Sequence, residues 1–434
     1  MDNKAIISLV VFILVYFLIG IEKTPRMYVV IAGVIFLILS NVYSFEEIHS
    51  YIDWSTIGFL FGIFIVLKIL ENSGFFNYLS LKIAKKFNYN PLKIFIVFPF
   101  LAWFLSEFVG SITVLVFMSP LTYALSRILK FDPIPFVIAE VCLANIGGAG
   151  TLMGDPPNVI LGSMFRLGFI NFIINNWILS FLGGIGAIFV FFKMNKKNLI
   201  DIKSNIKKEK FEELIPEEAI EDRLLMKLGL TGISVTVFLL ILRDFLMKHL
   251  SFNIALCSSI PAFAILFLKG GNPKLKNILK EIDIETLIFF IGLFAIVGSL
   301  EKTKVIQSVA LSFGKFSQKG IQTISLLFWG SAFTSSVIDN VPEAMSIGYL
   351  VKHLLSQIPY SFTILIWSSS LGLDIGGNLT PVGASANVVG YTFLEKQGVK
   401  IGWKKWIKLA TFPTMVSLFI CWAGLLLKWK LGFY

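Results

Sequence analysis

Long apolar runs recur along the whole chain and are separated by short polar stretches, for example at residues 5–21, 54–70 and 287–300. Crossing the hydrocarbon core of a bilayer takes about 20 consecutive apolar residues in a helix, and several runs reach or approach this length. The pattern therefore predicts an all-α polytopic membrane protein. No small-residue cleavage site follows the first run, so we expect a membrane helix there rather than a removed signal peptide.

The predicted elements form two series in the same order. The first half has helices near 5–22, 27–42, 54–71 and 170–193, a hairpin at about 92–128 and an interrupted helix at about 135–163. The second half has helices near 226–246, 252–269, 284–300 and 406–430, a hairpin at about 321–352 and an interrupted helix at about 361–392. We expect two repeats, 1–192 and 226–434, each with about five crossings, a re-entrant hairpin and an interrupted helix. The stretch 193–225, rich in Lys and Glu, is predicted to be a solvated linker.

The two interrupted helices contain matching polar stretches, IGGAGTLMGDPPNV at 146–159 and IGGNLTPVGASANV at 375–388. Gly147 and Gly376 hold the same place in the two stretches, as do Asn158 and Asn387. The segments 53–64 and 283–294 also match, at almost the same shift along the chain. The chain is therefore a duplication, and an odd number of crossings in each half makes the two halves inverted repeats.

Glycine- and proline-containing backbone within an apolar segment cannot face lipid, because its unpaired N–H and C=O groups would cost several kcal/mol each. Matching broken segments in two halves indicate a transporter binding site. The candidate ion- or substrate-binding residues here are Gly147, Gly148, Thr151, Asp155, Asn158, Gly376, Gly377, Asn378, Thr380, Ser385 and Asn387. Asn158 and Asn387 can equally be N-caps of the following helices. Asp155 either binds a cation or caps the helix opened by Pro156, and position 384 in the second copy is Ala.

The two hairpin tips supply the other candidates: Ser111 and Thr113 in the first, and Asp339 and Asn340 in the second. A carboxylate within a membrane segment is costly and usually faces the protein interior. Asp339 and Asn340 are therefore a possible Na+ site, since both offer side-chain oxygens. The alternative is that Asp339 caps a helix starting near Pro342.

Further acids fall within apolar segments, namely Glu107, Glu140, Glu343 and Asp374. These segments contain almost no basic residues, and Lys68 and Arg166 lie near segment ends, where snorkelling explains them. An acidic interior without basic partners would suit bound cations or protons.

Composition narrows the class of protein further. The chain is 56% hydrophobic and 15% charged, with a mean hydropathy of +0.80, unlike a soluble protein of 434 residues. Its net charge of +11 comes from loops beside apolar segments, which favours topology signals over nucleic-acid binding. The positive-inside rule then predicts a cell-membrane protein with both termini outside and the 193–225 linker in the cytoplasm, together with loop residues such as Lys23 and Arg26.

Neither the three cysteines nor the three histidines have metal-ligand spacing, and no nucleotide-binding loop is present. We expect no enzyme activity and no cofactor other than a possible bound Na+.

The motifs resemble the ion transporter superfamily, in particular the branch of the arsenite permease ArsB, the Na+/H+ antiporter NhaD and the melanosomal P protein. The resemblance rests on the Ala139–Val159 segment, on Asp339-Asn-Val-Pro and on the Gly376–Val388 segment. It implies hairpins and interrupted helices that meet at the membrane midplane, a homodimer with a fixed scaffold, and an elevator-like transport region.

The resemblance also bears on the ions. Dicarboxylate relatives carry Ser-Asn-Thr at both hairpin tips, and neither tip here has it, which argues against a succinate-type carrier. Antiporter-like relatives carry Asp-Asn at both tips. This chain has Asp339-Asn340 in the second tip but Gly110-Ser111 in the first, so a cation site at the first tip is in question.

We therefore predict a secondary active transporter working by alternating access, coupled to Na+ and H+ or exchanging them. The alternative is a permease for arsenite or another small anion, such as an oxyanion or carboxylate. An aspartyl protease built on Asp155 and Asp339 is disfavoured, because the chain reads Leu-Met-Gly-Asp before Pro156. A passive channel is disfavoured because it would leave the duplicated breaks unexplained.

Overall fold

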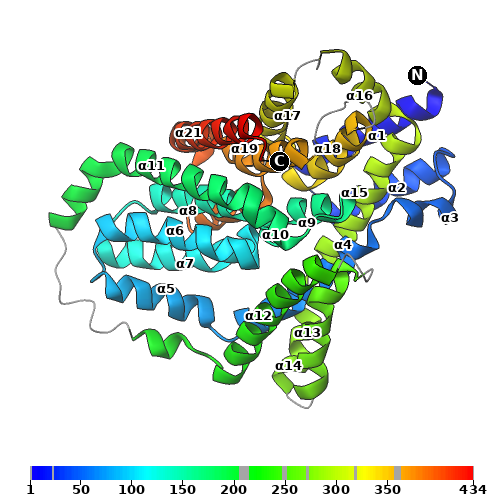
Figure 1. Cartoon of the computed structure of the whole chain (residues 1–434). Helices are drawn as coiled ribbons and strands as arrows, with labels where there is room; N and C mark the ends of the chain where they lie inside the picture. The colour runs from blue at the N-terminus through cyan, green and yellow to red at the C-terminus, as the bar shows by residue number, and fades with distance from the viewer. Residues whose placement is uncertain are drawn as a thin grey trace.

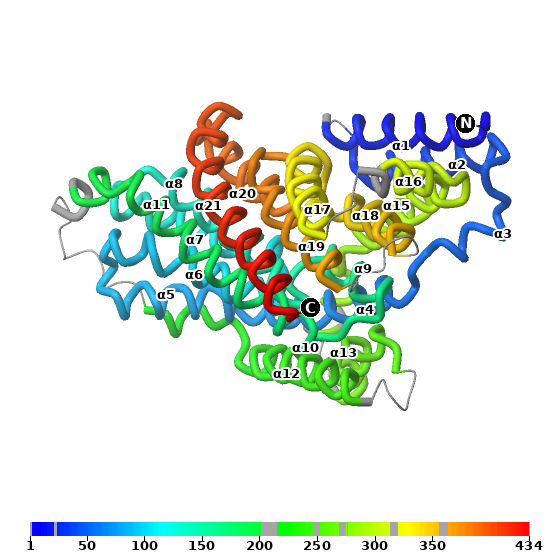
Figure 2. Tube along the Cα trace, turned by 45° about the horizontal axis from the view of Figure 1, so that its top comes forward, coloured from blue at the N-terminus to red at the C-terminus, as the bar shows by residue number. Residues whose placement is uncertain are grey.

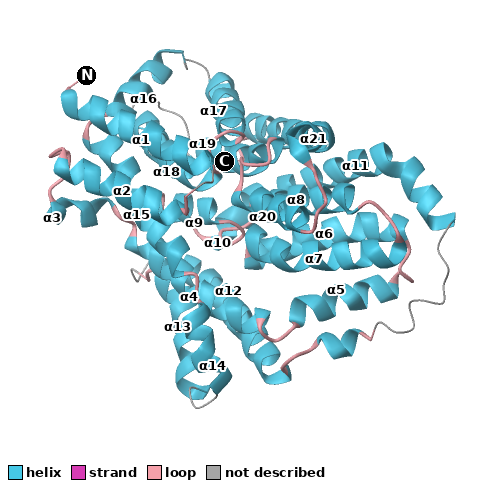
Figure 3. Cartoon of the chain, turned by 180° about the vertical axis from the view of Figure 1, so that it is seen from behind, coloured by secondary structure: helices cyan, strands magenta, loops and turns pink. Residues whose placement is uncertain are grey.

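The computed structural model describes residues 2–21, 24–204, 215–246, 252–269, 273–316, 320–355 and 363–433. These residues form helices and loops and contain no strand (Figures 1 and 3). Among them, eight helices are long and apolar enough to cross a membrane. The expected all-α polytopic fold is confirmed.

Helices of the first repeat follow one another with short connections. They are α1 (Asn3–Ile21), α2 (Arg26–Leu39), α3 (Phe45–Ile48), η1 (His49–Tyr51), α4 (Trp54–Glu71), α5 (Phe75–Lys86), α6 (Pro91–Val109), α7 (Ser111–Leu129), α8 (Pro133–Gly148), α9 (Pro156–Met164), α10 (Phe169–Phe172), η2 (Ile173–Trp177) and α11 (Ile178–Ser204). Local chemistry sets several starts: Asn90 and Asp132 cap α6 and α8, each followed by Pro at the first helical position. Gly110, at φ 81°, makes the sharp turn between α6 and α7.

The second repeat has the same order. After η4 (Pro216–Ala219), which falls in the expected linker, its helices are α12 (Arg223–Leu246), α13 (Ile254–Lys269), α14 (Pro273–Ile278), η5 (Leu279–Glu281), α15 (Ile284–Lys302), α16 (Val305–Phe316), α17 (Gly320–Ser335), α18 (Asn340–Leu355), α19 (Thr363–Gly376), η6 (Gly377–Leu379), α20 (Ser385–Lys396) and α21 (Gly402–Leu431). The segments corresponding to the first hairpin and first interrupted helix are α17 with α18, and α19 with α20.

The part of the chain expected to be a linker is partly helical. Helix α11 continues to Ser204, so that residues 193–204 belong to it. Residues 205–214 of the expected linker lie outside the described residues, and η4 follows them.

The short helices that were not predicted include α5 and α16, which lie between the third crossing and the hairpin in each repeat. Neither is long enough to cross a bilayer. Helix α5 buries Phe76, Ser80 and Ala84 at four-residue spacing, and exposes Lys82 and Lys85. The pattern is that of a helix lying along a surface, and only amphipathic spacing in the sequence could have revealed it.

Two sets of three helices, α1 with α2 and α15, and α4 with α12 and α13, are joined through α4 and α15 and are here together called the six-helix group; Figure 2 shows α1 and α2 at one edge of the molecule and α12 and α13 at the other. Glycines allow its helices to approach closely. A Cβ built on Gly62 of α4 would lie 2.6 Å from the Ser258 side chain of α13, and one built on Gly292 of α15 would lie 2.7 Å from Val30 of α2. The two glycines hold the same place in the matching segments 53–64 and 283–294, so the duplication extends to this close packing.

The hairpins and interrupted helices form the other group, here called the hairpin group: α6–α9, α11 and α17–α21. Helix α6 packs along α8, and α17 packs along α19. A Cβ on Gly147 would lie 2.2 Å from the Trp103 carbonyl oxygen, and a Cβ on Gly376 would lie 2.3 Å from Ala332. These glycines therefore bring each hairpin against its interrupted helix, which fixes where the tips end.

Candidate functional site

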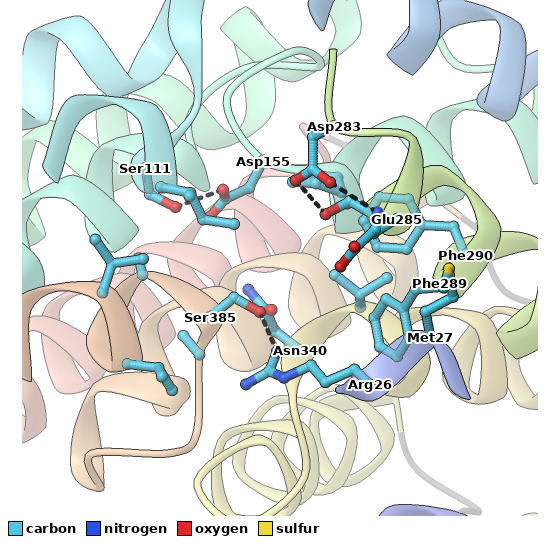
Figure 4. Close-up of a pocket in the computed structure, with 18 of the residues that line it drawn as sticks. Arg26, Met27, Ser111, Asp155, Asp283, Glu285, Phe289, Phe290, Asn340 and Ser385 are labelled. Atoms are coloured by element: carbon cyan, nitrogen blue, oxygen red, sulfur yellow. Dashed lines mark hydrogen bonds between the residues drawn. The ribbon is translucent and has the colours of Figure 1, made fainter. Parts of the chain in front are cut away.

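A cavity of about 610 Å³ lies between the six-helix group and the hairpin group. On the six-helix side it is lined by Arg26 and Met27 of α2 and by Glu285, Phe289 and Phe290 of α15. On the other side lie both hairpin tips and both breaks, represented in Figure 4 by Ser111, Asp155, Asn340 and Ser385. The two copies of the repeat thus meet at a single chamber.

The first tip and first break make one polar contact at the cavity wall. Ser111 Oγ donates to Asp155 Oδ1 at 2.6 Å. Asp155 is 3% exposed, and its Oδ2 has no hydrogen-bond partner among the described residues. One oxygen of this buried carboxyl therefore lacks a hydrogen-bond partner in the described part of the chain, and it lies against Gly148.

The second tip and second break make the corresponding contact with the roles reversed. Ser385 Oγ donates to Asp339 Oδ2 at 2.5 Å. Asp339 Oδ1 also accepts from the backbone N–H of Val341 at 3.2 Å, which is the capping role considered for it.

Asp339 has a basic partner as well. Arg26 Nη1 donates to Asp339 Oδ2 at 2.9 Å and to Ser385 Oγ at 2.9 Å. The prediction that the interior acids lack basic partners is therefore wrong for Asp339. Arg26 precedes a short apolar helix, so its sequence position suggested a loop charge, and no local pattern shows that it turns inward to the second tip.

The two carboxyls occupy exchanged positions in the repeat. The first tip has Gly110 where the second has Asp339, and the second break has Ala384 where the first has Asp155. Each tip–break pair therefore contains one carboxyl and one hydroxyl. The acid missing from the first tip is supplied by the neighbouring break.

The two threonines tie each break to its hairpin rather than face the cavity. Thr151 Oγ1 donates to the Glu107 carbonyl at 2.5 Å, and Thr380 Oγ1 donates to the Ser336 carbonyl at 2.5 Å.

The asparagines span the breaks. Asn158 Nδ2 donates to the carbonyls ten and seven residues earlier, both at 2.9 Å. Asn387 Nδ2 makes the same two bonds at 2.8 Å. These bonds satisfy carbonyls that the interrupted helix leaves unpaired, as buried backbone requires.

The remaining predicted residues are buried around the breaks. Gly148 leaves room for Asp155 and Gly377 for the Gly383 carbonyl, because a Cβ would lie 2.7 Å and 2.9 Å from them. Asn378 accepts a hydrogen bond from Asn145 at 2.7 Å. Of the predicted set, the cavity is lined by Ser111, Asp155, Asn340 and Ser385.

Thr113 lines a smaller adjoining cavity of about 270 Å³, which shares Asp155 and Asp283 with the larger one. A charged cluster lines part of this smaller cavity, with Lys68 Nζ 3.1 Å from Glu71 and 3.6 Å from Glu281. Asp155 thus borders both cavities.

The other interior acids lie behind the cavity wall. Glu140 accepts from Thr122 at 2.5 Å, Glu343 accepts from Thr334, and Asp374 accepts from Asn340 at 3.4 Å. Neither oxygen of Glu107 has a hydrogen-bond partner among the residues that the structure describes. Asp374 contacts the cavity residue Asn340. None of these four acids lines the cavity itself.

Several helices begin at the cavity. The first residues or N-caps of α2, α7, α9, α15, α18 and α20 line it, respectively Arg26, Ser111, Pro156, Asp283, Asn340 and Ser385. Helix N-termini carry partial positive charge and free N–H groups, so they favour anions. Acidic side chains also lie at the rim of the cavity, where Asp283 and Glu285 are exposed.

Sequence reasoning did not select Arg26, Glu285 or Thr286 as site residues. Asp283 begins the segment 283–294, whose match with 53–64 indicates the duplication and not a binding site. Within the described ranges, no group of three or more His, Cys, Asp or Glu side chains is arranged to hold a metal ion.

Residues 16–372 match the family model described as "Citrate transporter". The chain belongs to the citrate transporter family. Membership of the ion transporter superfamily is thereby confirmed. Members of this family are membrane transporters, not enzymes, so this chain is a multi-pass membrane transporter.

Two curated relatives show the breadth of the family. The chain is 30% identical to a 46 kDa membrane protein of Mycobacterium leprae over 432 residues, covering 95% of this chain and 96% of that protein. It is 25% identical to the human P protein over 451 residues, covering 86% of this chain and 53% of the P protein.

Two solved structures share the fold. MtrF of Neisseria gonorrhoeae, described as one of a class of antimetabolite efflux pumps, matches with a TM-score of 0.60 at 13% identity, over 99% of this chain and 95% of MtrF. The YdaH transporter of Alcanivorax borkumensis matches with a TM-score of 0.58 at 12% identity, over 89% of this chain and 88% of YdaH. At these identities the likeness concerns the fold alone.

Proposed function

We propose that this chain is a secondary active transporter that couples Na+ or H+ to the movement of a small anion by alternating access. The observation that carries the proposal is the cavity of about 610 Å³ at which both hairpin tips, both breaks and the six-helix group meet. A site lined by two mutually inverted repeats can be exposed to either side of the membrane by moving one helix group against the other.

The anion is supported by the helix N-termini that begin at the cavity and by the Arg26 guanidinium. A citrate-like carboxylate fits this chemistry, in keeping with the description of the family. Arsenite and other small oxyanions are the alternative substrates of the same chamber.

The coupling cation is supported by Asp155. Its buried carboxyl has one oxygen bonded to Ser111 and one without a partner. A carboxylate in a low-dielectric interior needs a compensating charge, so a proton or Na+ has to accompany it.

Na+/H+ antiport is the second candidate. The acidic side chains at the cavity favour it, since Asp155, Asp283 and Glu285 outnumber Arg26, the one basic residue among the described residues that line it.

Purified protein in liposomes tests both candidates. Labelled citrate, and separately arsenite, are offered with an imposed Na+ gradient, pH gradient or membrane potential, and a pH-sensitive dye reports proton movement. We expect gradient-driven accumulation of an anion that Asp155→Asn abolishes and the exposed-site control Glu217→Gln preserves. Na+-driven proton movement without anion uptake would favour antiport, and unsaturable flux that no gradient drives would refute a coupled transporter.

The moving and fixed parts belong to the same proposal. We propose that the six-helix group is the scaffold and that the hairpin group moves as an elevator, supported by the cavity between them. A homodimer is supported by the resemblance, and the exposed Phe263 and Phe267 of α13 leave an apolar surface that lipid or a second copy can cover. The mass of the purified protein, measured by light scattering with the detergent contribution subtracted, tests the dimer.

The proposed orientation has both termini outside and the 193–225 linker in the cytoplasm. In that orientation the cavity, with exposed Glu285 at its rim, opens toward the cytoplasm. Cysteines at the exposed positions Asp2 and Glu217 test this in intact cells, since Cys142, Cys257 and Cys421 are buried. An impermeant maleimide should label the first and spare the second; the reverse result would invert the orientation.

A further inference from the structure

Arg26 makes the two tip–break pairs chemically different. Its Nη1 bonds both Asp339 and Ser385 at 2.9 Å, and the Asp339 side chain is 4% exposed. The guanidinium stays charged at every physiological pH. At the second pair, the positive charge that the carboxylate requires is therefore part of the protein.

The first pair has no such residue. The positions of the second repeat that correspond to Arg26 are Ala255 and Leu256 of α13. Ala255 packs against α4, where a Cβ on Gly58 would lie 2.8 Å from it. Among the described residues no basic side chain forms an ion pair with Asp155, whose Oδ2 is unpartnered in the cavity wall.

The carboxyl of each pair is buried to a similar degree, with Asp155 3% and Asp339 6% exposed. Each accepts a hydroxyl hydrogen bond of similar length, 2.6 Å and 2.5 Å. Two sites with the same carboxyl–hydroxyl contact therefore differ in the source of the positive charge. At Asp155 that charge has to be mobile.

We propose that Arg26 is a tethered cation that occupies the second of two pseudo-symmetric cation positions, leaving Asp155 as the position for one mobile Na+ or proton. This inference rests on the proposed coupling function and specifies the number of cations in the site. It makes Arg26 the residue that sets the number of cations bound in this state.

The same ion pair joins the two helix groups. Arg26 begins α2 of the six-helix group, whereas Asp339 and Ser385 lie in the hairpin group. Movement of one group against the other would break the pair and leave Asp339 to bind a mobile cation. On return, the guanidinium competes for Asp339 and expels that cation, so Arg26 favours cation release on the side to which this cavity opens.

The charge displaced on cation binding tests the proposal. Proteoliposomes on a solid-supported membrane are exposed to jumps of Na+ at fixed pH, and of pH at fixed Na+, without anion. Arg26→Gln leaves a second carboxylate uncompensated, so it should displace about twice the charge of the wild type. Arg26→Lys, which keeps the charge, and the exposed-site control Arg127→Gln should displace as much as the wild type.

The double variant Arg26→Gln/Asp339→Asn removes both charges of the pair, so it serves if Arg26→Gln alone does not fold. It should return the displaced charge to the wild-type level. Loss of the displaced charge in this variant would place the mobile cation of this state at Asp339 instead of Asp155 and would overturn the proposal. An Arg26→Gln response equal to that of a responsive wild type would overturn the tethered cation but leave the coupling function intact. Silence of every variant to both ions would overturn both.

Discussion

The contact between each hairpin and its interrupted helix allows a quantitative prediction for Gly376→Ala. The added Cβ would lie 2.3 Å from the Ala332 backbone, whereas real Cβ contacts essentially never fall below 3.0 Å. The Ala332 atoms that the Cβ would meet belong to the backbone and cannot rotate away as a side chain could, so α17 and α19 have to separate. Overpacking of this kind costs about 1–3 kcal/mol.

The matched control lies on the same hairpin. Gly330 of α17 is exposed, and a Cβ added to it would have nothing within 4 Å. Replacing a glycine in a helix interior with alanine stabilises by about 0.5–1 kcal/mol. We therefore expect Gly376→Ala and Gly330→Ala to shift stability in opposite directions, with a difference of about 1.5–4 kcal/mol.

Thermal unfolding in detergent, followed by the fluorescence of the nine tryptophans, measures the difference. The apparent Tm of Gly376→Ala should fall below the wild type, and that of Gly330→Ala should equal or exceed it. Gly147→Ala should repeat the fall, because its Cβ would lie 2.2 Å from the Trp103 carbonyl. Equal Tm values for Gly376→Ala and Gly330→Ala would refute the argument that these glycines are required for close packing.

Two further predictions concern stability. Asn387→Ala removes both side-chain hydrogen bonds to the break carbonyls at 2.8 Å. It should therefore lower the free energy of unfolding by about 2–4 kcal/mol, measured by the same thermal unfolding. A Tm equal to that of the exposed-site control Asn77→Ala would show that these bonds do not stabilise the break. The hydrogen bond from Lys302 lowers the pKa of Glu47 from its usual 4.5 to about 2. A lowered folded-state pKa stabilises above the unfolded value and loses that effect as pH falls toward 2, so the Tm difference between wild type and Glu47→Gln should shrink from pH 6 to pH 3. A difference that grows on acidification would contradict the sign.

Much of the architecture follows from the sequence because its signals are local or repeat. Apolar runs predict crossings since a helix has to span a bilayer of fixed thickness. The alignment of Gly147 with Gly376 relates the two breaks, and the structure gives both glycines the same close contact. The amphipathic helices α5 and α16 escaped prediction because they are too short to cross.

The sequence predicted which segments form the candidate site, but not which of their side chains face the cavity and which pair with the backbone. Sequence reasoning grouped Thr151, Asn158, Thr380 and Asn387 with the residues expected to bind an ion. In the structure the two threonines donate to backbone carbonyls of the hairpins, and the two asparagines donate to backbone carbonyls of the breaks. Whether a hydroxyl or an amide faces a cavity or an unpaired carbonyl depends on the path of the chain through the break, which residue type does not reveal.

The sequence by itself determined the class of this protein: a duplicated, helical membrane transporter with its polar breaks and hairpin tips at corresponding positions. These features depend on hydropathy, chain length and internal repetition, all of which can be read along one dimension. The tertiary structure decided which charges meet. Asp339 and Arg26 are 313 residues apart, and Asp155 takes the place of an acid missing from the first tip, where it bonds Ser111, 44 residues earlier along the chain. Such contacts form because a buried carboxylate requires a partner, and the packing of the helices decides which side chain lies close enough to be that partner.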